Sequence, residues 1–348
     1  MSASSNLVLV SGGSGFLALH CIAAALRQGY RVRTTVRSPA KEQNVLKELA
    51  NAQPPVDTTK LEFVVADLLK DEGWNEAAAG AEIVLHVASP FPLTAPKHED
   101  ELIKPAVEGT LRVLRAAKAS GTVRRVVVTS SVASISYGTL PKDSPYTEED
   151  WSDPDGRQAP ITAYAKSKTL AEKAAWDYVK TDGKGLEMAT VNPVGIFGPP
   201  MLVPTESSTC GIVQQMLDGA MPAVPNIKFG FVDVRDVADL HMLAATTPGA
   251  NGQRYIAVAG KSASLLDMSN MLRTNLGAQA SKAPTRQMPN FLVKFLGLFM
   301  TQLKDTASEI GIVREFDNSK AKALGWTPRS NEESIISCAK ALLNGGSI

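Results

Sequence analysis

The sequence predicts an α/β fold in which a doubly wound parallel sheet is joined to a smaller, mainly helical C-terminal part. Short runs rich in Val and Ile alternate with longer segments whose apolar residues recur at helical spacing, a pattern typical of βα units. Several runs are apolar at successive positions, as expected for strands covered on both faces. The first run leads into a glycine-rich turn. Strands are expected at 6–10, 30–36, 61–66, 81–88, 124–131, 186–192 and 254–259.

The remaining segments are expected to cover the ligand-binding edge of this sheet. The Pro-rich stretch 198–211 and the residues from about 262 onward break the alternation and become mostly helical. Ligands of open α/β sheets bind beyond the carboxyl ends of the strands, so we assign these segments to substrate. The predicted division is a sheet-forming part at 1–192, rejoined by 226–260, and a substrate-binding part at 193–225 and 261–348.

Composition argues against several classes of function. The chain of 348 residues is 44% hydrophobic and has a formal net charge of +1, so it can bury a sizeable core but lacks the basic excess of a nucleic-acid-binding protein. Its three cysteines are scattered and show no metal-site spacing. No secretory signal is recognised. We expect a cytoplasmic monomer or homodimer with a small-molecule partner, and no metal, nucleic acid or membrane.

One apolar stretch leaves an alternative open. Residues 290–300 contain Lys294 and are too few to span a bilayer. We expect them to form an apolar helix of the substrate-binding part. A helix at a membrane surface or against a partner is the alternative interpretation.

The turn after the first expected strand is suited to holding a phosphate. Gly12, Gly15 and Ala18 form a G-x-x-G-x-x-A array that opens the first expected helix. Glycine permits a tight turn and close approach of a pyrophosphate, and a helix N-terminus offers free N–H groups and a positive dipole end. A plain strand-to-helix turn would share this pattern, so the context must decide. If this turn holds the pyrophosphate of a dinucleotide cofactor, Phe16 and Leu17 are expected to contact that cofactor as well.

The end of the second expected strand indicates which dinucleotide is bound. NAD sites usually carry Asp or Glu there for the ribose hydroxyls, whereas this chain has Arg37, followed by Lys41. An arginine can donate a forked pair of hydrogen bonds to a 2′-phosphate, which favours NADPH or NADP+. A solvated surface arginine is the alternative. Further cofactor contacts are expected at the ends of the third and fourth strands or just after them, at Asp67, Leu68, Val87, Ala88 and Ser89.

A serine pair and the motif YAKSK supply the candidate chemistry. Tyr164 and Lys168 lie four residues apart on an expected helix at 162–180 and so share one face. An adjacent ammonium favours the phenolate and should bring proton transfer by the tyrosine into the working pH range. Ser130 and Ser131 end the fifth strand, where a hydroxyl can stabilise negative charge on a substrate oxygen. An amphipathic helix alone could carry the Tyr and Lys, but the combination is more specific.

Nine segments in order carry a resemblance over nearly the whole chain. They are SGGSGFLA, TVRSP, ADL, HVASP, VVVTSSVAS, YAKSK, NPVGIFGP, VDVRDVA and LGWTP. With them the chain resembles the extended short-chain dehydrogenase/reductases, and more narrowly the dihydroflavonol reductase-like, NADPH-dependent carbonyl reductases.

The resemblance implies that the sheet-forming part is an NADP-binding, Rossmann-type domain with a catalytic triad. The triad would be Ser131, Tyr164 and Lys168, because the family's catalytic hydroxyl directly precedes a small-residue run, here VAS. Ser130 would be a neighbouring cofactor contact. Lys168 would also bind the nicotinamide ribose, and the backbone at Pro193 and Val194 would orient the carboxamide.

Two positions depart from the family pattern. Ala18 replaces the third glycine, as in some reductases of the group, and should still permit close helix packing. Flavonoid-reducing members carry Asn or Asp five positions after the catalytic serine, where this chain has Ser136. That difference weakens the expectation of a flavonoid substrate.

The expected function is NADPH-dependent reduction of a ketone or aldehyde to an alcohol. Hydride would come from the nicotinamide and a proton from Tyr164, while Ser131 polarises the carbonyl. The alternatives are a hydroxysteroid dehydrogenase or a sugar epimerase/dehydratase on the same fold, or a non-catalytic NADP-sensing protein. Arg37 argues against an NAD-retaining epimerase, and the complete triad against a sensor. Candidate substrate contacts are Phe91, Ala133, Met201 and Phe231.

Overall fold

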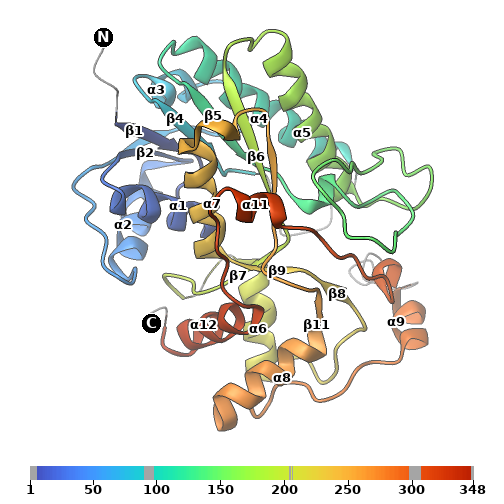
Figure 1. The fold of residues 1–348 in the computed structure, drawn as a ribbon. Coiled ribbons are helices and arrows are strands. Elements are labelled where there is room, and N and C mark those ends of the chain that lie inside the picture. Colours follow the sequence, from blue (N-terminus) through green and yellow to red (C-terminus); the bar gives the residue numbers. More distant parts are fainter. Residues whose placement is uncertain (1–5, 90–97, 204, 206, 298–306, 346–348) are drawn as a thin grey trace.

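A parallel sheet of seven strands forms the centre of the computed structural model, which describes residues 6–89, 98–203, 205, 207–297 and 307–345 (Figure 1). The strand order is β10-β6-β5-β4-β1-β2-β3, and every neighbouring pair is parallel. All seven expected strands are present, which confirms the predicted fold class. They are β1 (Leu7–Val10), β2 (Arg31–Val36), β3 (Leu61–Val65), β4 (Ile83–His86), β5 (Arg125–Thr129), β6 (Glu187–Pro193) and β10 (Arg254–Ala257).

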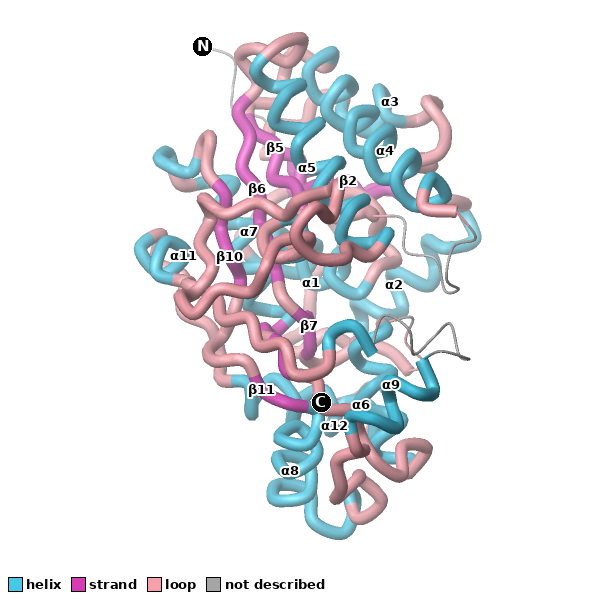
Figure 2. Tube along the Cα trace, turned by 90° about the vertical axis from the view of Figure 1, so that its right-hand side faces the viewer, coloured by secondary structure: helices cyan, strands magenta, loops and turns pink. Residues whose placement is uncertain are grey.

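Helices cover both faces of the sheet. Helices α1, α2 and α7 pack on one face, and α3, α4 and α5 form a second buried cluster on the other (Figures 1 and 2). The chain order reverses between β1 and β4, so the carboxyl ends of these two strands mark the point at which such sheets bind ligands. The helices are α1 (Phe16–Arg27), α2 (Glu42–Ala50), α3 (Trp74–Ala78), α4 (Asp100–Ala119), α5 (Ala163–Lys180) and α7 (Val234–Thr246), with short 3-10 turns η1 (Pro39–Lys41), η2 (Val132–Ser134) and η3 (Pro248–Ala250).

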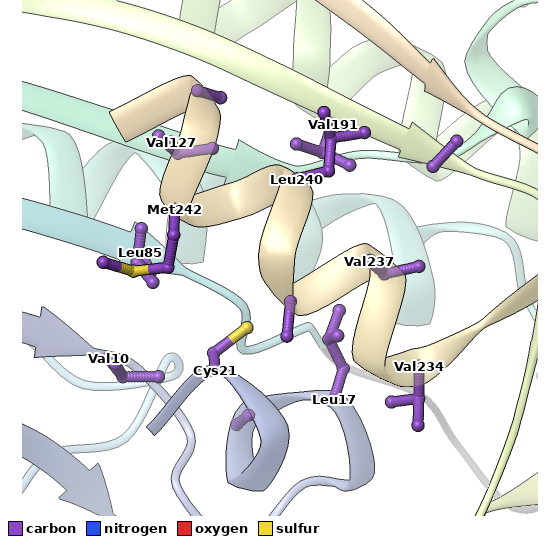
Figure 3. Packing of buried hydrophobic residues seen from close by; sticks show 14 of the residues in the cluster. Val10, Leu17, Cys21, Leu85, Val127, Val191, Val234, Val237, Leu240 and Met242 are labelled. Carbon is purple, nitrogen blue, oxygen red and sulfur yellow. The ribbon is translucent and has the colours of Figure 1, made fainter. Parts of the chain in front are cut away.

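Figure 3 shows the larger core, in which α1 and α7 meet the underside of the sheet. Leu17 and Cys21 of α1 share this core with Val237 and Leu240 of α7, and all four side chains are buried. Full burial of an aliphatic side chain of this size contributes about 1.5–3 kcal/mol. This packing holds the start of α1, and with it the glycine turn, against the sheet. The strands contribute Val10, Leu85, Val127 and Val191.

A second group of elements follows β6 and has its own apolar core. Helices α6, α8 and α12 lie together below the sheet (Figure 1). They share an apolar core with the buried rings of Phe197 and Phe231. Within 226–260, helix α7 packs on the main sheet and strand β10 belongs to it. Strand β8 pairs with β11 and strand β9 pairs with β7, both outside the main sheet. The division into two functional parts stays a prediction. The elements are α6 (Ser208–Asp218), α8 (Leu265–Leu276), α9 (Asn290–Gly297), α11 (Ser319–Ala323), α12 (Asn331–Leu343), η4 (Gly277–Ala280), β7 (Gly195–Phe197), β8 (Lys228–Phe229), β9 (Phe231–Asp233) and β11 (Ala263–Ser264).

The apolar stretch 290–300 begins with helix α9, and residues 298–300 lie outside the described residues. Across the described ranges, no helix combines the length and apolar character needed to cross a bilayer.

Candidate active site

The glycine turn joins β1 to α1 at the point where the strand order reverses. Gly12 has φ +73°, and a Cβ atom there would lie 2.9 Å from the Cβ atom of Ala88. At Gly13 a Cβ atom would lie 2.3 Å from the Oγ1 atom of Thr34. The N–H of Gly15 donates to the Gly12 carbonyl at 2.9 Å and closes the turn. The main chain therefore runs so close to the neighbouring strands that side chains are excluded.

The start of α1 suits the phosphate expected from the sequence. Gly15 is the N-cap, no side chain caps it, and the first turn carries no acidic residue. The first N–H groups of a helix lack intrahelical partners and attract anions. The side chain of Leu17 is buried in the core, and that of Phe16 is half-buried. The donor set of this turn fits a dinucleotide phosphate.

Ser11 links the glycine turn to the end of β4. The sequence analysis did not identify this link. Its Oγ atom accepts hydrogen bonds from the N–H groups of Val87 and Ala88, both at 3.0 Å. The same Oγ lies 2.9 Å from Nδ1 of His86. Burial lowers the pKa of His86 to about 3, so its ring is neutral and can accept the serine proton. A hydroxyl directly after β1 is the only sequence signal, and the partners lie more than 70 residues away.

The structure places the candidate NADP contacts at the carboxyl edge of the strands. Arg37 directly follows β2 and is exposed, and Lys41 ends η1. Asp67 comes two residues after β3, and its carboxylate accepts the N–H of Leu69 at 3.0 Å. Because β1, β2 and β3 are parallel neighbours, these groups lie on the same edge as the glycine turn. Leu68 lines a cavity together with Ala88, Ser89 and Ser130.

Strand β5 and helix α5 bring the catalytic candidates together. Helix α5 begins after Thr162, whose hydroxyl accepts the N–H of Ala165 at 3.2 Å, and it packs against η2 just beyond β5. The Ser131 hydroxyl hydrogen-bonds the Tyr164 phenol. The Nζ atom of Lys168 lies 5.9 Å from the centroid of the Tyr164 ring. The three side chains therefore meet at one place.

Lys168 also reaches the cofactor edge of the site. Its Nζ atom donates to the Oγ atom of Ser89 at 3.0 Å. Desolvation lowers the pKa of Lys168 to about 8, and the charge of Glu172 opposes that change. The ammonium is therefore retained at neutral pH but can lose its proton in mildly alkaline solution.

The pKa of Tyr164 differs from the sequence expectation. Burial raises the pKa of this phenol, and the hydrogen bond with Ser131 opposes the rise only in part. We expected the ammonium of Lys168 to favour the phenolate, but in this structure desolvation of the phenol dominates. A raised pKa keeps the phenol protonated at neutral pH, which is the form that donates a proton.

The residues expected to orient the nicotinamide carboxamide lie at the end of β6. Pro193 is its last residue, and Val194 follows, buried, with its N–H donating to the Ala257 carbonyl at 3.2 Å. The role of both residues in orienting the cofactor stays a prediction.

The candidate substrate contacts are dispersed. Phe91 lies outside the described residues. Ala133 is buried in η2, two residues after Ser131. Met201 is 6% exposed and belongs to the core beneath the sheet, and Phe231 is fully buried, with its ring centroid 4.8 Å from that of Phe229. The side chains of Met201 and Phe231 thus serve packing here, and their contact with substrate stays a prediction.

Replacing Gly13 by Ala is expected to weaken cofactor binding at least tenfold, because the new methyl group collides with Thr34 and must displace the turn. Isothermal titration with NADPH measures the loss. Gly211→Ala is the matched control, since a Cβ atom on that helical glycine meets nothing within 4 Å. Equal NADPH affinity in the two variants would contradict the close approach inferred for Gly13.

Several proteins of similar sequence and structure are named as reductases. Residues 8–260 match the model of the NAD dependent epimerase/dehydratase family. A cinnamoyl-CoA reductase of Medicago truncatula is 36% identical over 255 residues, which are 72% of this chain and 76% of that protein. A ketoreductase of Aspergillus niger is 31% identical over 347 residues, 94% of this chain and 95% of that one. Yeast methylglyoxal/isovaleraldehyde reductase, solved with NADPH, has a TM-score of 0.80 at 28% identity, covering 97% of this chain and 98% of that one.

Proposed function

The chain belongs to the NAD dependent epimerase/dehydratase family, and we propose that Ser131, Tyr164 and Lys168 perform an NADPH-dependent reduction of a ketone or aldehyde to an alcohol. The observation that carries the proposal is the meeting of these three side chains at the end of β5, on the same sheet edge as the glycine turn. Relatives that match nearly the whole chain are named as reductases of carbonyl compounds.

The glycine turn, Arg37 and residues 87–89 after β4 would hold NADPH. The N–H groups at the start of α1 would bind the pyrophosphate, and the guanidinium of Arg37 would bind the 2′-phosphate. Ser89 and Lys168 would meet the nicotinamide half. When bound, the cofactor supplies the hydride. The yeast relative solved with NADPH supports this assignment.

The three catalytic candidates would divide the remaining work. The Ser131 hydroxyl donates a hydrogen bond to the substrate oxygen and stabilises the negative charge that develops there. Tyr164, protonated because burial raises its pKa, gives its proton to that oxygen. The ammonium of Lys168 stabilises the phenolate that is left behind.

Carbonyl reduction is favoured over the other functions open to the fold. An NAD-retaining epimerase has no use for a cation at Arg37, which stands where an acidic residue would bind the ribose hydroxyls. A non-catalytic sensor has no need of the Ser131, Tyr164 and Lys168 cluster. A hydroxysteroid dehydrogenase would use the same three groups, so steroids belong in the substrate test.

Turnover tests the proposal. NADPH absorbance is followed with aryl ketones, β-keto esters, aliphatic aldehydes, flavonoids and steroids, and each assay is repeated with NADH. Consumption of NADPH with at least one carbonyl compound is expected. Tight NADPH binding without turnover of any member of the panel would contradict the reductase and return the sensor to consideration.

The proposed partner is a small carbonyl compound and the proposed location is the cytoplasm, with a monomer or homodimer as the assembly. Cys21, Cys210 and Cys338 are free thiols in the structure, as is usual in a reducing compartment. The net charge of +1 supplies no general attraction to polyanions. Light scattering would measure the assembly state.

Replacing Arg37 by Ala is expected to lower the preference for NADPH over NADH by about 10–100-fold, because a charge-assisted hydrogen bond contributes roughly 1.5–3 kcal/mol. The change should lie in KM for NADPH, with KM for NADH little altered. Arg31→Ala is the control, an exposed arginine at the opposite end of the same strand. An unchanged cofactor ratio in Arg37→Ala would assign Arg37 to the solvated surface.

A further inference from the structure

We propose that Glu172, clamped by Arg254, is a positioning residue that holds the Ser131 main chain and sustains the charge of Lys168. This inference deepens the proposed function and rests on it. Glu172 lies one helical turn beyond Lys168 on α5 and is 1% exposed. No motif in the sequence pointed to it.

One oxygen of the Glu172 carboxylate faces the catalytic serine. Its Oε2 atom accepts hydrogen bonds from the hydroxyls of Ser130 and Ser134, both at 2.5 Å, and from Nδ2 of Asn192 at 2.8 Å. These donors come from the end of β5, from η2 and from β6. The carboxylate therefore ties together the segments on either side of Ser131.

The other oxygen of Glu172 faces away from the serine. Its Oε1 atom accepts from Nε of Arg254 at 2.6 Å, from Nε1 of Trp176 at 3.1 Å and from the Thr190 hydroxyl at 3.2 Å. The Arg254 guanidinium stacks on the Trp151 ring, with Cζ 3.8 Å from the ring centroid. Arg254 is thus fixed on two sides, and it fixes the carboxylate in turn.

Two of these donors also hold the main chain of Ser131. The Ser131 carbonyl lies 2.7 Å from the Ser134 hydroxyl and 3.3 Å from Nδ2 of Asn192. The single hydrogen of the Ser134 hydroxyl is shared between the Ser131 carbonyl and the Glu172 carboxylate. The two hydrogens of the Asn192 amide face the same two acceptors and the Ser134 oxygen. Displacement of the carboxylate would release both groups and shift the catalytic hydroxyl, and small misplacements of such groups reduce rates strongly.

Glu172 and Lys168 also interact through space. Both line a cavity of about 20 Å³, together with Ser130 and His86. The Arg254 charge and the hydrogen bonds lower the pKa of Glu172 against the effect of burial, so it is an anion at neutral pH. Among the described residues, the other titratable groups that face Lys168 are Tyr164 and His86, and both are neutral there.

Stability alone is a weak reason for this arrangement. Removing two charges from water offsets most of their attraction, and well-packed apolar replacements of buried ion pairs are often as stable. The placement of the Glu172 carboxylate between the segment that holds Ser131 and the side chain of Lys168 has a clearer consequence for catalysis.

Glu172→Gln tests the proposal, because it keeps the shape and removes the charge. We expect kcat to fall at least tenfold with KM for NADPH changed less than about threefold, since misplacement of Ser131 affects the reaction step. The alkaline limb of kcat/KM should also move to lower pH by about one unit, because Lys168 loses its proton more readily. Trp176→Phe is the control, since it removes one neutral hydrogen bond from the same carboxylate and should leave the alkaline limb in place.

A measurement without turnover separates this proposal from the proposed function. Competitive labelling with acetic anhydride at a series of pH values, read by mass spectrometry, reports the pKa of Lys168 in the cofactor-free protein. If the wild type reduces no carbonyl compound, the proposed function fails, and the labelling still shows whether Glu172→Gln lowers that pKa. An unchanged Lys168 pKa together with unchanged kcat would overturn the positioning role.

A second variant covers the case in which Glu172→Gln does not fold. Ser134→Ala keeps both members of the buried ion pair and removes one tie between Glu172 and the Ser131 carbonyl. It also removes the acceptor of hydrogen bonds from Nη2 of Arg254 and Nδ2 of Asn192. We expect a lower kcat with an unchanged alkaline limb. Wild-type kcat in Ser134→Ala would overturn the link to the serine.

Discussion

Replacing Tyr164 by Phe is expected to reduce kcat/KM for the carbonyl substrate by about 10²–10⁴-fold, the usual contribution of a positioned proton donor. The substitution removes one hydroxyl, which hydrogen-bonds the Ser131 hydroxyl in the structure. Without it, the developing alkoxide loses the phenol that would protonate it. Steady-state kinetics with NADPH and the best substrate of the panel measure the effect.

Cofactor affinity and folding should be preserved in this variant, so the loss should lie in kcat. Titration with NADPH and the thermal midpoint check both points. Tyr178→Phe is the matched control, because that tyrosine lies near the opposite end of the same helix and packs in the α4–α5 layer. Substantial kcat in Tyr164→Phe would transfer the proton-donor role to another group.

Replacing Lys168 by Met is expected to lower kcat/KM by about 10²–10³-fold, the range found when one stabilising electrostatic group is removed from an active site. In the wild type, the same dependence of the rate on the Lys168 charge should be seen when the pH is varied. The pKa of Lys168 is lowered to about 8, so the ammonium is present below that pH and is lost above it. The value of kcat/KM for NADPH should therefore fall as pH rises through about 8, because this constant reports the free enzyme.

Two variants distinguish this explanation from general alkaline inactivation. Lys168→Arg keeps a positive charge at all working pH values, so its alkaline limb should disappear even if its overall rate is lower. Lys166→Met is the matched control, since its Nζ atom pairs with Glu99 at the surface, 2.9 Å away. Persistence of the wild-type limb in Lys168→Arg would show that another group titrates.

Much of the site could be predicted because its parts are local in sequence. The glycine turn is a property of residues 11–18, and the shared face of Tyr164 and Lys168 follows from their spacing on one helix. Arg37 could be placed at the sheet edge from the strand that precedes it. Each of these inferences needs only adjacent residues and the geometry of a helix or strand.

Other parts of the site depend on residues that are distant in sequence. Glu172 and Arg254 are 82 positions apart, and a glutamate one turn after a lysine is an ordinary feature of an exposed helix. Ser11 and His86 are likewise joined only by the pairing of β1 with β4. The aromatic ring of Phe231 resembled a pocket residue in sequence and is fully buried in the structure.

By itself, then, the sequence determined the seven strands, the fold class, the glycine turn and the group formed by Ser131, Tyr164 and Lys168. The first three, and the shared face of Tyr164 and Lys168, follow from apolar periodicity, backbone preference and spacing, which are set by near neighbours along the chain. The choice of Ser131 as their partner came from the family resemblance. Only the tertiary structure decided the buried carboxylate beside Lys168, the partners of Ser131 and the direction in which the pKa of Tyr164 moves. Those properties depend on which groups exclude water from one another, and packing between distant segments decides that.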